Sequence, residues 1–404
     1  MTIADTPSGQ PLPDLFPADA HDPLAARAQA LRRVLHADAP ARDQAGGRPV
    51  AAAQALKASG LNAAWIPVDY GGEGASWTSV LRTVREIART DGSLAHLYGY
   101  QHLPQHITWA RAAEPQLRRW FTTAAREQWL WSNSGNVMSK TSSARRVGGR
   151  WVLDGFRPFS SGTHVADVIQ VSWEAGAQRY AALIPADREG VRIEDDWDGI
   201  GQRQTGSGTV TFAGVAVHDD ELLGGPDEAI TPFASLTSLL QQIVLANVFI
   251  GSAQGALSEG RDYTLAQSRP WIHAGVERHA DDPWVQRQYG DLFIQTQAAL
   301  ELAEQAAAEL DAVYAQGRDL SAQTRGRLAI SLGAANLVAG EAALAVAEQV
   351  FEVMGARSAT RANGYDRFWR NVRTHTLHNP TEYKKRTLGQ WLLAGRYPEP
   401  APYR

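Results

Sequence analysis

The chain has 404 residues, a formal net charge of −4, 13 tryptophans, three methionines and no cysteine. At about 150 residues per domain, this length predicts two or three domains, large enough to form stable cores without covalent cross-links. The absence of cysteine excludes disulfides, thiolate zinc sites, iron–sulfur clusters and a cysteine nucleophile. Basic and acidic residues are evenly mixed, so we expect no binding of nucleic acid or of an anionic membrane surface.

Residues 1–21 are rich in proline and contain acidic side chains but no basic stretch followed by an apolar one. We therefore expect a flexible lead-in and no secretory signal. The chain also lacks a continuous run of 18 apolar residues, so we expect no membrane-spanning segment. A cytoplasmic location is the resulting expectation.

Helical periodicity dominates the region from 22 to 130. Asp22, followed by a proline, is a typical helix start. A second helical stretch runs from Pro49 to Ser59 and would end at Gly60. A third, Ser76–Arg89, carries apolar residues at helical spacing. The pattern predicts an N-terminal helical domain.

Short apolar runs separated by turns replace this pattern over residues 131–228. The predicted strands are Arg150–Leu153, Val168–Trp173, Arg179–Ile184, Val191–Ile193 and Val210–Phe212. Gly148-Gly149 is a typical hairpin turn. Because no long helix separates these strands, the sequence predicts a compact antiparallel β domain.

Over residues 229–404, apolar residues again recur at helical spacing in long stretches. The first stretch carries Leu239, Ile243, Ala246 and Ile250. Short connections between such stretches indicate an antiparallel four-helix bundle. The predicted fold class is therefore α+β, with an N-terminal helical domain, a small β domain and a C-terminal bundle.

Several familiar motifs fail on their context. The glycine-rich stretches 71–74 and 205–208 do not connect a strand to a helix, so they are turns and not dinucleotide-binding loops. No Walker loop and no nucleophilic serine elbow is present. His102 and His106 have the spacing of a metal pair, but Pro104 lies between them and no third ligand is evident. No metal site is predicted.

The segment from 357 to 378 combines arginines, two histidines and large apolar side chains. A solvated basic face is the usual interpretation of such a run. However, Phe368, Trp369 and Leu377 require part of the segment to be buried. A buried guanidinium needs an anionic or accepting partner, and its planar shape suits phosphate. An anionic cofactor at this segment is therefore one hypothesis.

A second polar stretch, 131–143, leads into residues 150–162 and is rich in serine, asparagine and glycine. Such neutral donors and acceptors suit a flat heteroaromatic ring with amide edges, such as a flavin. An ordinary polar loop is the alternative.

Four motifs extend these hypotheses through a family resemblance. They are WVLDGFRPFSSGTHVADVIQV from Trp151, DDWDGIGQRQTGSGTVTF from Asp195, RPW from Arg269 and FWRNVRTHTLHNP from Phe368. Together with the domain order, they resemble the acyl-CoA dehydrogenase superfamily and, within it, the dibenzothiophene monooxygenase branch with its sulfur-acquisition relatives. The resemblance extends from about residue 22 to residue 398.

The same motifs separate this chain from the dehydrogenases. Those enzymes whose base lies near the C-terminus carry a tyrosine and a glutamate at a fixed step after an Arg-x-x-Arg pair. Counted from Arg370 and Arg373, these two positions hold His378 and Asn379. An amide cannot abstract a proton, and Glu382 lies three residues further on. Dehydrogenation is therefore not expected.

The resemblance implies a two-component flavin monooxygenase of the group D type. Reduced FMN (FMNH2) would diffuse from a separate NAD(P)H:flavin reductase, and O2 would add to it as a C4a-(hydro)peroxide. The substrate would be a small or aromatic organosulfur compound, oxidised at sulfur or at a neighbouring carbon. An N-hydroxylase of amines, an acyl-CoA dehydrogenase-like flavoprotein and a non-catalytic scaffold are the alternatives. The family also implies a homotetramer.

Site residues follow from the matched motif positions. His96 and His378 correspond to the oxygen-activating histidines, and Tyr100, Asn133 and Ser161 to residues around the isoalloxazine and substrate. The implied cofactor-binding residues are Tyr100, Asn133, Ser134, Phe159, Ser160, Ser161, Trp197, Arg269, Ala356, Arg357 and His378. Arg269, Ala356 and Arg357 would bind the flavin tail, partly from a neighbouring subunit. The substrate pocket is expected to depend on residues 129–138 and 230–245.

Overall fold

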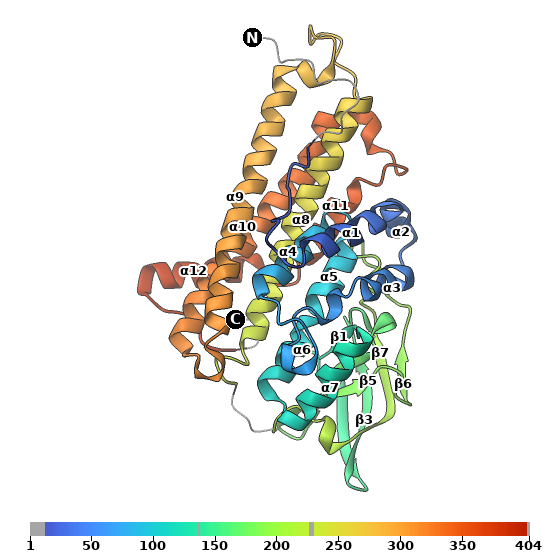
Figure 1. Ribbon diagram of the computed structural model, residues 1–404, viewed down its shortest axis with the longest axis vertical. Helices are drawn as coiled ribbons and strands as arrows, with labels where there is room; N and C mark the ends of the chain where they lie inside the picture. The colour runs from blue at the N-terminus through green and yellow to red at the C-terminus, as the bar shows by residue number, and fades with distance from the viewer. Residues whose placement is uncertain (1–12, 136–137, 226–229, 402–404) are drawn as a thin grey trace.

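A computed structural model describes residues 13–135, 138–225 and 230–401 of the chain. Long helices form an elongated bundle, shorter N-terminal helices pack along one side of it, and a β-sheet lies at one end (Figure 1). This arrangement confirms the predicted α+β order of helical region, sheet and helical bundle.

The N-terminal region consists of seven helices within the described residues. They are α1 (Ala25–His36), α2 (Ala39–Ala45), α3 (Val50–Ala58), α4 (Trp77–Ala88), α5 (Gly92–Tyr100), α6 (His102–Arg111) and α7 (Glu114–Glu127). The hydroxyl of Ser76 caps α4 by accepting from the Ser79 amide at 3.2 Å. Asp91 caps α5 in the same way through the Leu94 amide at 2.8 Å. Gly60, with φ of 73°, ends the predicted second helix.

The N-terminal segment is more firmly attached than its composition suggests. Phe16 is only 7% exposed, and the Arg89 guanidinium donates to its carbonyl oxygen at 2.9 Å. Arg89 also pairs with Asp14. The described part of the lead-in, residues 13–21, is thus packed against the helices, which differs from the flexible segment expected from its prolines.

Seven strands within the described residues form one sheet. They are β1 (Trp131–Ser134), β2 (Ser142–Val147), β3 (Arg150–Arg157), β4 (Val168–Ala175), β5 (Gln178–Pro185), β6 (Val191–Ile193) and β7 (Val210–Val217). The order is β1-β4-β2-β3-β7-β6, with β5 also paired to β4. Gly148 and Gly149, both with positive φ, make the predicted hairpin between β2 and β3.

The sheet is mixed, which corrects the expectation of an antiparallel one. β1 runs parallel to β4 along its whole length, and β2 meets β4 in parallel at one residue pair. Neither β1 nor β2 was among the predicted strands, because their serines and arginines show no apolar alternation. Both strands owe their place to pairing with neighbours rather than to β propensity.

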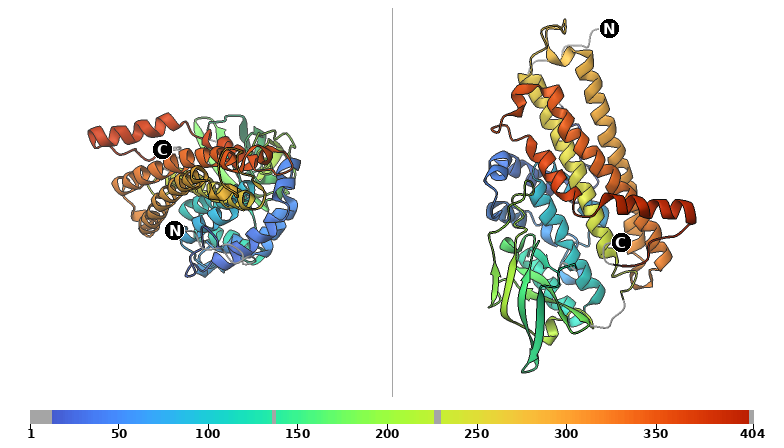
Figure 2. Two further views of the ribbon diagram at one scale, coloured as in Figure 1. Left: turned by 90° about the horizontal axis from the view of Figure 1, so that it is seen from above. Right: turned by 180° about the vertical axis from the view of Figure 1, so that it is seen from behind.

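The C-terminal region contains α8 (Leu236–Gln267), α9 (Pro283–Tyr314), α10 (Ala322–Met354), α11 (Asp366–Thr376) and α12 (Thr381–Ala394). The three long helices lie alongside one another, α11 packs against α8 and α10, and α12 projects to one side (Figure 2). α8 and α10 are long and apolar enough to span a membrane, but most of each is buried inside the protein, as in core helices.

Two separate cores follow from this packing. One continuous apolar cluster joins the N-terminal helices to the bundle, and a second, smaller cluster lies within the sheet. Glycines let α4 approach α8 closely, since an added Cβ at Gly251 would lie 2.3 Å from the Arg85 carbonyl oxygen. At Gly255 the corresponding distance to the Arg89 carbonyl is 2.1 Å. The same packing sets α5 beside α11.

Candidate active site

Three histidines and a tyrosine from two distant parts of the chain gather between α5 and α11. The ring of His96 stacks on Tyr100 with centroids 4.0 Å apart, and on His375 with centroids 4.4 Å apart. His378, in the turn after α11, meets the Tyr100 ring edge-on at 6.3 Å. The packing of α5 against α11 thus brings together His96, Tyr100 and His378, which lie far apart in the sequence.

The buried histidines of this cluster are neutral. Burial, followed by the neighbouring His378, lowers the pKa of His96 to about 3. Burial and the other two imidazoles hold the pKa of His375 well below its usual value. Neither nitrogen of His96 has a hydrogen-bond partner among the described residues, nor does Nδ1 of His375. Such unpartnered, buried donors and acceptors favour a bound polar ligand or water at this place.

His378 occupies the open edge of the cluster. Its side chain has access to solvent, but the surrounding protein and then the positive charge of Lys384 lower its pKa. A hydrogen bond with Asn379 has the opposite, weaker effect. The ring is therefore a neutral imidazole at pH 7, able to donate from one nitrogen and to accept at the other.

Serines connect the start of the sheet to the loop after β3. Ser132 donates to the Ser161 carbonyl oxygen at 2.6 Å, and the hydroxyls of Ser134 and Ser160 lie 2.8 Å apart. The Ser161 hydroxyl lies 2.6 Å from that of Ser207. Asn133 lies between the two β1 serines and is partly exposed. These contacts place Ser134, Ser160 and Ser161 in one polar wall, whereas Asn133, on the opposite face of β1, takes no part in these hydrogen bonds.

An open pocket of about 280 Å³ adjoins this wall, with Phe159 and Trp197 on its sides. Phe159 has a φ of 57°, rare for a bulky residue, and is 65% exposed. Its ring meets that of Trp197 edge-on at 6.3 Å. The Trp197 indole donates to the Gln202 carbonyl at 2.9 Å, and the amide of Gln202 donates to Asn371 of α11 at 2.6 Å. The pocket wall is thereby fixed to the helix that carries His375.

Arg269, Ala356 and Arg357 lie elsewhere. They follow the C-terminal ends of α8 and α10, which lie at the opposite end of the bundle from the sheet (Figure 1). Arg357 donates to the Gln267 carbonyl oxygen, which keeps the two connections together. Within one chain, the fold does not bring these three residues to the histidine cluster.

Two largely buried arginines of the 357–378 segment have acidic partners within the chain. Arg367 pairs with Glu259, and Arg370 pairs with Asp43 and, at 2.7 Å, with Asp366. Carboxylates of the same chain therefore pair with both guanidinium groups, although Nε of Arg367 has no partner among the described residues, so the burial of these two arginines does not by itself indicate an anionic cofactor.

His102 and His106 are held by internal hydrogen bonds. His102 Nδ1 lies 3.2 Å from the Gly99 carbonyl oxygen, and His106 lies 2.8 Å from the Tyr314 hydroxyl and 3.1 Å from the Phe233 carbonyl oxygen. Within the described residues no group of histidine and carboxylate side chains has the arrangement of a metal site.

Sequence reasoning missed His375 and Lys384 as members of the site. The spacing of three between His375 and His378 was the available indication, because it places both on neighbouring positions of a helical turn. Nothing local marks Lys384, whose place follows only from the packing of α12 against α10.

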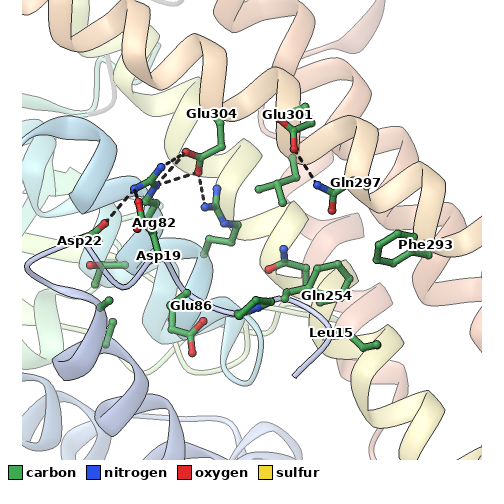
Figure 3. Close-up of a pocket in the computed structure, with 18 residues that line it drawn as sticks. Leu15, Asp19, Asp22, Arg82, Glu86, Gln254, Phe293, Gln297, Glu301 and Glu304 are labelled. Carbon is green, nitrogen blue, oxygen red and sulfur yellow. Dashed lines mark hydrogen bonds and ion pairs between the residues drawn. The ribbon is translucent and has the colours of Figure 1, made fainter. Parts of the chain in front are cut away.

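A larger pocket of about 580 Å³ lies between the N-terminal segment, α4, α8 and α9 (Figure 3). Arg82 crosses it to pair with Asp19 and Glu304, at 2.7 Å in each case, and Arg85 pairs with the same glutamate. None of the clustered histidines lines this pocket. Its ion pairs join the N-terminal segment to the bundle and do not contribute to the candidate site.

The residues at the sheet and the histidine cluster suit a flavin ring. Ser161 and Asn133 are the partly exposed polar groups near the pocket, Phe159 and Trp197 supply aromatic surface, and His96 has two unpartnered buried nitrogens among the described residues. In the turn after α11, Asn379 follows His378 and the nearest carboxylate along the chain, Glu382, is 83% exposed. The site therefore fits oxygen chemistry better than proton abstraction.

Comparison with protein families gives two matches. The description "Acyl-CoA dehydrogenase, N-terminal domain" matches residues 21–128, and "Acyl-CoA dehydrogenase, C-terminal domain" matches residues 243–383. The two matches together include α5 and α11, the helices that carry the clustered histidines.

Individual relatives are similar over almost the whole chain. A probable FMNH2-dependent monooxygenase, SfnC of Pseudomonas putida, is 40% identical, over 90% of this chain and 92% of its own length. Dibenzothiophene monooxygenase of Rhodococcus qingshengii is 39% identical, over 95% and 96%. The solved structure of methanesulfinate monooxygenase MsuC from Pseudomonas fluorescens superimposes with a TM-score of 0.91 at 38% identity, over 95% of this chain and 99% of that one.

Proposed function

Because the chain belongs to the acyl-CoA dehydrogenase family, in the branch of the dibenzothiophene monooxygenases, we propose that it is an FMN-dependent monooxygenase acting on organosulfur compounds. One structural observation supports this above all others. It is a cluster of three stacked or adjoining histidines, in which buried His96 is neutral and has no hydrogen-bond partner among the described residues.

Reduced FMN, when bound, supplies two electrons and the C4a position at which O2 adds. We assign His96 and His378 to hold the reacting oxygen by donating hydrogen bonds, with Tyr100, Asn133 and Ser161 around the ring and substrate. Neutral imidazoles suit this task because they would donate hydrogen bonds to the oxygen without carrying an additional acidic proton. Burial of His96 and His375 keeps water from that side of the cluster, whereas His378 remains open to solvent.

The flavin ring would lie against Ser134, Ser160, Phe159 and Trp197. Arg269, Ala356 and Arg357 would bind the flavin tail of a neighbouring subunit, because they lie too far from the histidines of their own chain. This assignment requires at least a dimer, and a homotetramer is the proposed state.

The electron supply belongs to the same proposal. No dinucleotide-binding motif is present in the sequence, so a separate NAD(P)H:flavin reductase would deliver FMNH2 by diffusion. The overall reaction then balances: one oxygen atom of O2 enters the substrate, and the other leaves as water with the two electrons and two protons of FMNH2. We propose the cytoplasm as its location.

Rapid mixing of the protein–FMNH2 complex with O2 tests this proposal. The expected result is a transient flavin absorbance that outlasts the one in free solution, followed by sulfoxide formation from a thioether. Failure to bind FMNH2 would leave a non-catalytic scaffold, and reduction of bound flavin by an acyl-CoA would indicate a dehydrogenase. A panel of thiophenes, sulfones, alkanesulfinates and amines would separate oxidation at sulfur from N-hydroxylation.

A further inference from the structure

Lys384 is a partly buried cation beside the candidate site. It lies in the first turn of α12, and its ammonium group donates a hydrogen bond to the side-chain oxygen of Asn336 on α10. No carboxylate lies within ion-pair distance of it in the described parts of the chain. Its neighbour Lys385, in contrast, is paired with Glu341 at 3.1 Å.

The surroundings of Lys384 connect it to both the histidine cluster and the bundle. Its charge acts on His378 strongly enough to contribute to the lowered pKa of that ring. Asn336 in turn donates to the carbonyl oxygen of Gln242 on α8 at 2.7 Å. Three elements therefore converge here, and Gln242 belongs to the stretch 230–245 that the sequence analysis connects with the substrate pocket.

A partly desolvated ammonium with only a neutral amide partner is an unfavourable arrangement. Burial lowers the pKa of Lys384 to about 8, so the group is still mostly charged at neutral pH. An anion placed between Lys384 and His378 would relieve this cost through a charge-assisted hydrogen bond.

We propose that Lys384, with Asn336 and His378, forms the subsite for an anionic group of the substrate, an alkane- or arylsulfinate being the fitting class. This inference rests on the proposed function, because it places the sulfur of a sulfinate beside the oxygen-activating histidines. A sulfinate oxygen accepts from Lys384, while its sulfur lone pair faces the reacting oxygen. Transfer of one oxygen atom then yields the sulfonate.

The phosphate of FMN is the other anion that could supply the same chemistry. The position of α12 favours the substrate. α12 packs on α10 and projects away from the sheet (Figure 2). Phe159 and Trp197, proposed to bind the ring, belong to the sheet region, since Phe159 follows β3 and Trp197 lies between β6 and β7. The proposed tail-binding Arg269 and Arg357 lie at the far end of the bundle.

Substrate competition provides the test. We would measure kcat/KM for benzenesulfinate and for the neutral thioether thioanisole, with FMNH2 supplied by a flavin reductase. Lys384→Met is expected to lower the sulfinate-to-thioether ratio of kcat/KM by about 10- to 100-fold, mainly through KM, because a charge-assisted hydrogen bond is lost. Lys384→Arg should restore most of the ratio, and the matched control Lys385→Met should not change it.

Two direct binding measurements distinguish the sources of the anion. Benzenesulfonate should inhibit thioanisole oxidation competitively in the wild type and at least 10-fold more weakly in Lys384→Met, with FMN affinity the same in both. A fall in FMN affinity would instead assign the subsite to the flavin phosphate and overturn the inference. An unchanged ratio, or an equal loss on both substrates, would overturn it as well. If the wild type oxidises thioanisole but not the sulfinate, the inference fails while the proposed function stands. If the wild type oxidises neither compound, the proposed function itself is wrong.

Discussion

At the scale of single residues, the properties of the site come from burial more than from pairing. His96 is 3% exposed and stacked between two rings, so its charged form is excluded at neutral pH. The sequence located His96 and His378 through a family resemblance, and not through their local pattern. A buried histidine in an apolar helix has the same sequence pattern whether it is structural or functional. The sequence therefore did not predict His375 as a residue of the site.

His378→Ala is expected to abolish oxygen transfer without abolishing flavin oxidation. Loss of a positioned hydrogen-bond donor to the reacting oxygen costs about 100- to 1,000-fold in rate, so sulfoxide should fall at least 100-fold. FMNH2 would still be consumed, with O2 released as hydrogen peroxide. Product and peroxide assays measure this partition. His21→Ala, at an exposed position, is the control, and normal sulfoxide yield in His378→Ala would contradict the assigned role.

The stability of the protein should fall as the pH decreases through 6.5. His96, His102 and His106 have folded-state pKa values of about 3, 4 and 4, each lowered mainly by burial. The unfolded chain binds these protons near pH 6.5, whereas the folded chain does not. Each histidine therefore lowers the free energy of unfolding by about 1.4 kcal/mol for each pH unit below 6.5. Urea unfolding at pH 7.5 and 5.5 measures the slope. His96→Asn should reduce the slope of unfolding free energy against pH by the contribution of one histidine. An unchanged slope would show that His96 titrates normally.

At the scale of elements, periodicity identified the helices and most of the strands. It failed for β1 and β2, whose serines and arginines are positioned by parallel pairing to β4 and by hydrogen bonds across the sheet. It also failed for the arginines of α11, because their partners Glu259 and Asp43 are more than 100 residues away in the chain. Long-range pairing of this kind leaves no trace in local sequence.

The close contact between α4 and α8 should tolerate no side chain at Gly255. A methyl group there would lie 2.1 Å from the Arg89 carbonyl and 2.7 Å from the Phe368 ring. Gly255→Ala is expected to destabilise the fold by about 1–3 kcal/mol through overpacking and to lower monooxygenase activity by moving α11. Denaturant unfolding measures the change. Gly290→Ala on α9, with nothing within 4 Å, should instead stabilise by up to about 1 kcal/mol; equal effects at both positions would contradict the packing argument.

At the scale of the whole molecule, two of the exposed apolar places are pairs of neighbouring residues. Trp271 and Ile272 are 68% and 80% exposed in the α8–α9 connection, and Leu392 and Leu393 are 76% and 88% exposed near the end of α12. Surfaces of this kind are typical of subunit contacts. They support the proposed oligomer, in which Arg269, two residues before Trp271, would reach a flavin held by another chain.

Subunit mixing tests this arrangement. Arg269→Ala should weaken FMN binding about 10- to 100-fold, and His378→Ala should be inactive in oxygen transfer. If each site takes Arg269 from one chain and His378 from its neighbour, random co-assembly of the two variants restores about a quarter of the sites. Sulfoxide formation in refolded mixtures measures the recovery. Mixtures no more active than the average of the separate variants would place Arg269 outside a shared site.

The continuous core between the N-terminal helices and the bundle also determines when the site comes into existence. The chain interrupts this core with a sheet that has its own apolar cluster. His96 therefore leaves the ribosome roughly 280 residues before His375 and His378, which at about 5–20 residues per second is an interval of tens of seconds. During that time the sheet can fold, but α5 has no α11 to cover it. A nascent chain thus lacks the assembled cluster of His96, His375 and His378 until its synthesis is nearly complete.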